Sequence, residues 1–99
     1  MAMIATEKTK PRPPLQVDLS RTFIRRVDLS NARLVRADLS FADCTNANFR
    51  GADFQDAKLV GTILRGADLT DVKHLTSEQL SLAIIDDTTI LPAYLKSVR

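Results

Sequence analysis

The sequence contains one cysteine, Cys44, and one histidine, His74, the two side chains best suited to nucleophilic, acid–base or metal chemistry. A reactive thiol needs solvent exposure and a lowered pKa, whereas Cys44 falls in a regular series of large apolar residues. His74 has no second histidine or cysteine with which to bind a metal, and no nucleophile is evidently placed beside it. We therefore predict structural roles for both residues, no enzymatic activity, no metal or other cofactor, and no small-molecule substrate.

The basic residues could support a different chemistry, the binding of phosphate groups. Residues 1–36 carry eight basic and three acidic side chains, whereas the whole chain has a net charge of +2. Only one aromatic residue, Phe23, lies beside the arginines for stacking on bases, and acidic residues alternate with them. We interpret these residues as a solvated charged surface. A nucleic-acid or anionic-surface binder that uses the basic N-terminal third is the alternative function.

A repeat of five residues runs through 17–71 and indicates how the side chains are positioned. Every fifth residue is large and apolar, two residues after a small one, in eleven consecutive units. The large residues are Leu19, Ile24, Leu29, Leu34, Leu39, Cys44, Phe49, Phe54, Leu59, Leu64 and Leu69. A period of five would spread them around an α-helix, and a continuous strand alternates with a period of two. Neither regular element explains the pattern.

A coil that turns after each unit does explain it. The small and large residues are two apart, so a short extended segment points both toward the same side. If the other residues turn the chain, stacked coils bury a continuous apolar column. Seven of the eleven residues between the small and the large one are Asp or Asn, which favour turns. Gly51, Gly61 and Gly66 occupy the last slot of their units, where a corner is expected.

Several units match the pattern A-(D/N)-L-x-x of the pentapeptide repeat family, which the sequence resembles over residues 17–71: ADLSF (37–41), ANFRG (47–51), ADFQD (52–56) and ADLTD (67–71). The resemblance implies an all-β solenoid, a right-handed quadrilateral β-helix with 20 residues per coil. Some family members resemble double-stranded DNA and inhibit DNA gyrase. That role needs a long acidic rod, and this chain is short and slightly basic.

A coil of 20 residues divides the chain into a solenoid of about three coils and two flanking segments. We expect a flexible, basic, Pro-rich arm over 1–16, the β-helix over 17–76 and a C-terminal helical cap over 77–99. Stacking predicts four inner columns: Leu19/Leu39/Leu59, Ile24/Cys44/Leu64, Leu29/Phe49/Leu69 and Leu34/Phe54/His74.

The two ends of the solenoid need covers. Thr76 followed by Gln79 forms a capping-box pattern and predicts a helix that starts near Thr76. Leu80, Ala83 and Ile84 would share one face of this helix, which is expected to lay Leu80 and Ile84 over Leu59, Leu64, Leu69 and His74. A second short turn is expected near Pro92. The segment similar to those that close pentapeptide repeat proteins spans 75–95. No helix-forming segment precedes coil one, so we predict that residues 11–16 or a second chain covers that end.

Four outward positions carry apolar side chains where the repeat favours polar ones. These residues and three nearby arginines form our candidate interaction surface: Phe23, Phe41, Val60, Ile63, Arg25, Arg26 and Arg65. Isolated exposed apolar residues are the alternative interpretation. We predict a non-enzymatic protein-interaction scaffold whose partner is another protein or a second copy in a homodimer. Because no apolar run is long enough for a membrane span or a signal-peptide core, we expect a cytoplasmic protein.

Overall fold

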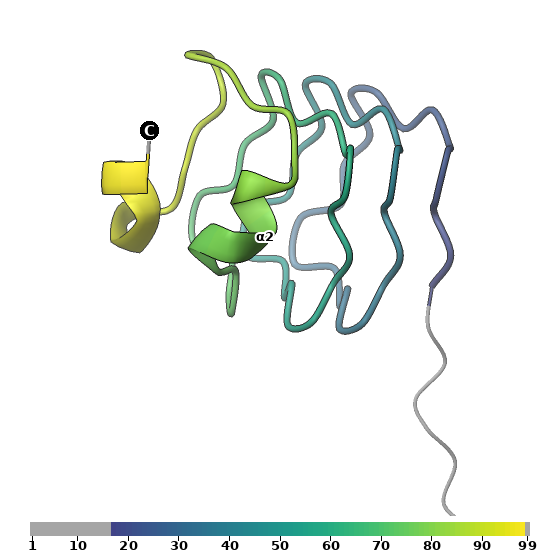
Figure 1. Cartoon of the computed structure of the whole chain (residues 1–99), viewed down its shortest axis with the longest axis horizontal. Helices are drawn as coiled ribbons and strands as arrows, with labels where there is room; N and C mark the ends of the chain where they lie inside the picture. Colours follow the sequence, from purple (N-terminus) through teal and green to yellow (C-terminus); the bar gives the residue numbers. More distant parts are fainter. Residues whose placement is uncertain (1–16, 99) are drawn as a thin grey trace, which may run out of the picture.

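The computed structural model describes residues 17–98, which wind into a stack of four-sided coils (Figure 1). Parallel single-residue bridges join positions twenty residues apart, as the repeat predicts. From coil one to coil two they join Asp18 to Asp38, Phe23 to Asp43, Asp28 to Asn48 and Arg33 to Asp53. The next row continues to Lys58, Ile63, Asp68 and Lys73. Each coil therefore has four bridging positions, and we number the sides one to four in chain order from Asp18, Phe23, Asp28 and Arg33.

The corners form where the backbone is left-handed. The last residue of every unit has a positive φ, and only three of these residues are glycines: Arg21, Arg26, Asn31, Arg36, Phe41, Asn46, Gly51, Asp56, Gly61, Gly66 and Asp71. The Asp and Asn side chains support these corners as predicted. In all seven units that contain one, its Oδ1 accepts a hydrogen bond of 2.9–3.1 Å from the backbone N–H two residues later.

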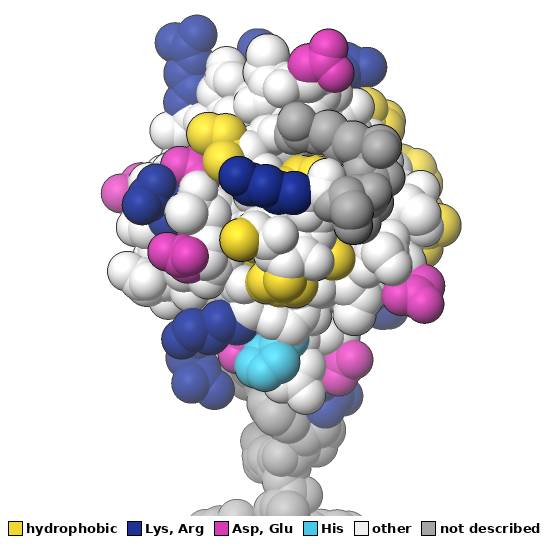
Figure 2. Space-filling view, turned by 90° about the vertical axis from the view of Figure 1, so that its left-hand side faces the viewer, with side chains coloured by type: hydrophobic (Ala, Val, Ile, Leu, Met, Phe, Trp, Pro, Cys, Tyr) yellow, Lys and Arg dark blue, Asp and Glu magenta, His cyan; other side chains and the backbone are white. Residues whose placement is uncertain are grey.

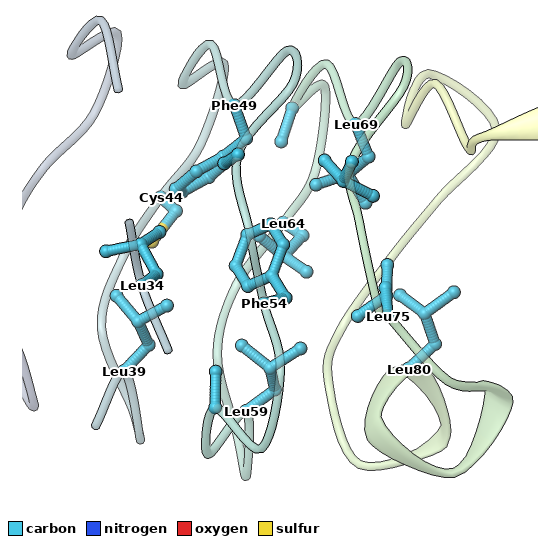
Figure 3. Packing of buried hydrophobic residues seen from close by; sticks show 14 of the residues in the cluster. Leu34, Leu39, Cys44, Phe49, Phe54, Leu59, Leu64, Leu69, Leu75 and Leu80 are labelled. Atoms are coloured by element: carbon cyan, nitrogen blue, oxygen red, sulfur yellow. The ribbon is translucent and has the colours of Figure 1, made fainter. Parts of the chain in front are cut away.

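The interior is filled by the large residues of the repeat (Figure 3). Phe49 and Phe54 are fully buried, with ring centroids 5.3 Å apart. The predicted burial of Leu39, Cys44 and Leu59 is also confirmed. Leu19 is only half-buried, because coil one has a neighbouring coil on one side only within the described residues.

The prediction for the end of the fourth column was wrong. His74 lies at the surface (Figure 2), with a φ of 63° and its Nδ1 2.9 Å from Oδ1 of Asp53. Leu75 is buried in its place, near Phe54 (Figure 3). The additional left-handed residue offsets the five-residue count by one, and it moves the polar ring out of the core to a carboxylate partner.

Helix α2 (Ser77–Ser81) begins where the capping box predicts. The Thr76 side chain accepts a hydrogen bond from the backbone N–H of Gln79, and the Gln79 side chain accepts one from the Thr76 N–H. Leu80 is buried, and Nε2 of Gln79 donates to the carbonyls of Phe54 and Ala57 at 2.9 Å each. These contacts hold α2 against the last coils.

The predicted helix is too long, because α2 ends at Ser81 and the chain becomes extended. Ala83 still packs against the core, but the prediction that Ile84 covers the last coil was wrong. Ile84 donates its N–H to the carbonyl of Thr62 and accepts from the N–H of Leu64. Its side chain therefore faces outward and is 38% exposed. Backbone groups of the preceding coil need partners, and an extended segment supplies them better than another helical turn.

The chain ends in a 3₁₀ helix, η1 (Ala93–Val98), which follows the predicted turn at Pro92. Leu91 and Leu95 are buried, whereas the Tyr94 side chain is largely exposed. The Tyr94 hydroxyl nevertheless donates to the carbonyl of Val72 and accepts from the N–H of Leu75. The predicted arm over 1–16, and with it the covering of coil one by residues 11–16, lies outside the described residues.

Candidate interaction surface

Side two carries apolar side chains in an outward column. Bridges connect Phe23 to Asp43, Asp43 to Ile63 and Ile63 to Ile84, so these four residues follow one another along the solenoid axis. Phe23 is 85% exposed at the N-terminal edge, and Asp43 separates it from the two isoleucines. Sequence reasoning placed Phe23 and Ile63 correctly but assigned Ile84 to the interior.

The corner between sides one and two holds Phe41 in a defined position. Its ring lies against the backbone of Gly61, so closely that a Cβ at position 61 would overlap it. Cζ of Arg21 also lies over the Phe41 ring, 4.9 Å from its centroid, a distance at which a guanidinium is attracted to an aromatic face. Phe41 is nevertheless 51% exposed.

Two further apolar residues flank this corner. The carbonyl of Val60 accepts the N–H of Phe41, and the carbonyl of Leu82 accepts the N–H of Gly61, both at 2.8 Å. Both side chains are exposed. We call the resulting surface the side-two patch and define it by five residues: Phe41, Val60, Ile63, Leu82 and Ile84. The period-two spacing of Leu82 and Ile84 after the helix was the sequence signal that could have revealed them.

The three predicted arginines lie on one flank of the patch, toward side three. Nε of Arg25 lies 3.8 Å from Oδ2 of Asp43. The hydroxyl and backbone N–H of Thr45, together with the guanidiniums of Arg25 and Arg65, hold the pKa of Asp43 below its ordinary value despite some burial. Arg26 occupies the corner between sides two and three. All three arginines are exposed, so the flank of the patch toward side three is basic and holds one ionised carboxylate.

The side chains suited to chemistry are not arranged as a reactive centre in the described part of the chain. Cys44 is fully buried, and burial raises the pKa of its thiol to about 12, which keeps the thiol protonated. A surface hollow adjoins His74, but the Thr76 hydroxyl there already donates to Oε1 of Gln79, and each side chain also accepts the backbone N–H of the other residue. Within residues 17–98, no group of three His, Cys, Asp or Glu side chains could hold a metal ion.

Comparison with known families accounts for this architecture. The sequence pattern of the family described as pentapeptide repeats matches residues 16–43 and 32–71, in eight copies. The chain belongs to the pentapeptide repeat family. No curated protein matches the chain in sequence.

Solved pentapeptide repeat structures include proteins similar to this chain. One, from the cyanobacterium Cyanothece 51142, is 30% identical with a TM-score of 0.68, and the match covers 78% of this chain and 52% of that one. A pentapeptide repeat protein of the Arabidopsis thaliana thylakoid lumen is 26% identical, with a TM-score of 0.41 and coverages of 77% and 55%. The chain thus spans about half the length of these relatives.

Membership of the family and the similarity to the Cyanothece structure imply the hand and the cross-section of the solenoid. The pentapeptide repeat fold is a right-handed quadrilateral β-helix, and the four bridging positions per coil agree with it. No helix within residues 17–98 is both long and apolar enough to cross a membrane. The side-two patch departs from the polar outward positions that the repeat pattern favours.

Proposed function

We propose that this pentapeptide repeat protein is a non-enzymatic interaction scaffold that binds a partner protein at the side-two patch and also associates with a second copy of itself. The observation that carries the proposal is the grouping of five exposed or half-exposed apolar side chains on two adjacent rows of the solenoid. Apolar patches with polar rims are typical of protein-interaction sites. The cytoplasmic location expected from the sequence stays a prediction.

The charges around the patch favour one class of partner. Arg25, Arg26 and Arg65 are exposed on its flank toward side three, so a complementary surface carries acidic side chains along one edge of an apolar area. Phe41 is a suitable anchor because Arg21 and Gly61 already restrict its ring. A side chain that is ordered before binding loses less conformational entropy when it is buried.

Binding to nucleic acid is the competing function, and salt dependence distinguishes the two. Phosphate contacts release counterions, so affinity for a duplex falls steeply with salt. Affinity that comes from burial of an apolar anchor depends much less on salt concentration. Arg25 is already paired with Asp43, and Arg50 lies 3.3 Å from Asp68, which reduces the positive charge available to phosphates.

The test measures capture of proteins from the source cell by the wild-type chain and by Phe41→Ala and Val60→Ser variants. Ile90→Ser is the matched control, because Ile90 is an equally exposed apolar residue on side three. Loss of a buried anchor should weaken binding of a captured partner about thirtyfold, whereas the control keeps wild-type affinity. Equal binding by all variants would exclude the patch, and tight, salt-sensitive binding to a DNA duplex would support the alternative.

A further inference from the structure

The N-terminal end of the solenoid presents a ring of backbone hydrogen-bonding groups. In coil two, the N–H and C=O of Asp38 both point toward coil one and bond Val17 and Leu19. The equivalent groups of coil one therefore point away from the solenoid, and they bond no other residue within 17–98. They belong to the four bridging residues of coil one, one on each side: Asp18, Phe23, Asp28 and Arg33.

The apolar interior is also less covered at this end. Leu19, Ile24 and Leu29 are half-buried, whereas the corresponding residues of coil two, Leu39, Cys44 and Phe49, have no exposed surface. An end with open backbone groups and accessible apolar side chains is suited to pairing with another polypeptide edge.

A second copy of this chain fits the end through a two-fold axis perpendicular to the solenoid. Such an axis reverses the chain direction, so all four sides of one copy meet the other antiparallel. In an antiparallel pair, residues directly opposite each other exchange both hydrogen bonds. Four N–H groups from each copy then find acceptors, eight bonds in all, and no bridging N–H of coil one remains unpaired.

The rise of the coil restricts where the axis passes. Coil one advances along the solenoid axis by one strand spacing, about 4.8 Å, over its four sides. The N-terminal end is therefore not flat, because side four of coil one lies deeper in the solenoid than side one. The N-terminal ends of the two copies stay at the same distance from each other on all four sides only if coil one of each copy begins at the same place around the solenoid axis. This requires the two-fold axis to pass through the corner where side one begins and side four ends.

The side chains agree with this axis. It places side one opposite side four and side two opposite side three, so Asp18 faces Arg33 of the second copy and Phe23 faces Asp28 of the second copy. By symmetry each pair occurs twice. Axes through the middle of sides would instead oppose Asp18 to Asp18 or Arg33 to Arg33, and like charges directly opposite are destabilising.

We propose that the chain forms a two-fold dimer through coil one, with Asp18 and Arg33 paired reciprocally between copies. The inference rests on the self-association included in the proposed function, and it specifies the surface and the register. The dimer leaves the side-two patch, which begins in coil two and extends to Ile84 beyond coil three, free for a different partner.

The test is sedimentation of the full chain over concentrations that bracket the micromolar range. Arg33→Glu places two carboxylates opposite each other at both sites and should weaken dimerisation about tenfold. Lys73→Glu is the matched control. Arg33 and Lys73 both form backbone β-bridges with Asp53, but Lys73 lies far from the N-terminal end. The double variant Asp18→Lys with Arg33→Glu restores opposite charges and should recover dimerisation.

Three results would overturn the inference. They are a monomeric wild-type chain at every concentration, equal effects of Arg33→Glu and Lys73→Glu, and a double variant as weak as Arg33→Glu alone. Circular dichroism of each variant checks that the coil is intact. If the dimer instead dissociates in Phe41→Ala, self-association uses the side-two patch, and the scaffold function stands while this interface fails.

Discussion

Replacement of Gly61 by alanine tests how the corner of the candidate site is built. Gly61 has a φ of 67°, and the ring of Phe41 occupies the space that a Cβ would need. The substitution therefore has two separable costs, one from the backbone conformation and one from the displaced ring.

The expected cost follows from these two contributions. An L-residue in the left-handed region costs about 1 kcal/mol relative to glycine. Displacement of the Phe41 ring removes its contact with the Arg21 guanidinium, about 0.5–1 kcal/mol for an exposed cation–π pair. We therefore expect Gly61→Ala to lower the free energy of unfolding by about 2 kcal/mol.

A double-mutant cycle in urea separates the two contributions. In a Phe41→Ala background the ring is absent, so Gly61→Ala should cost only the backbone contribution, about 1 kcal/mol. Unfolding is followed by circular dichroism for the wild type, both single variants and the double variant. The same cost in both backgrounds would show that the ring does not occupy this space, and the described position of Phe41 would be wrong.

Three other predictions concern the fold. Phe54→Ala should lower the unfolding free energy by about 3–5 kcal/mol in urea, since Phe54 is fully buried; a cost below about 1 kcal/mol would contradict this packing. Cys44 should react with a thiol reagent only after unfolding, because it is buried with its pKa raised to about 12; labelling of the native chain within minutes would oppose this. Hydrogen bonds from Ser20 and Ser30 lower the pKa of Asp18 and Asp28 from 3.8, so these carboxylates stabilise the fold above that value and lose this contribution as pH falls through the lowered pKa. The urea midpoint should therefore drop on acidification from about pH 5 to pH 2, and a flat profile would refute the role of these bonds.

The sequence was sufficient to predict the coil because every unit encodes the same local choice. Eleven units with a small residue two positions before a large apolar one indicate a coil, and in seven of them the residue between the two is Asp or Asn. The hand of the coil and its four sides came from the family resemblance. The outward residues Phe23 and Ile63 followed from the same count. A repeat of this kind makes local and global preferences agree.

The segment after the last repeat could not be predicted in the same way. His74 stood at the expected interval, but one additional left-handed residue placed Leu75 inside. Ile84 fitted a helical pattern, yet the backbone groups of Thr62 and Leu64 drew it into an extended ladder. Both outcomes depend on partners distant in sequence. The interaction surface was predicted only in part for this reason, since Leu82 and Ile84 join it through those same bonds.

The identical bridging pattern between successive coils bears on how such a chain can change in length. Coils two and three are joined by the same backbone hydrogen bonds that join coils one and two. An in-frame genetic duplication of residues 37–56 would therefore insert a complete extra layer and leave both terminal surfaces unaltered. It would also move the N-terminal end and α2 apart by one strand spacing, about 4.8 Å. The length of this fold therefore changes by whole coils. Duplication or loss of a coil would change the distance between two binding surfaces while the residues of each surface stay the same.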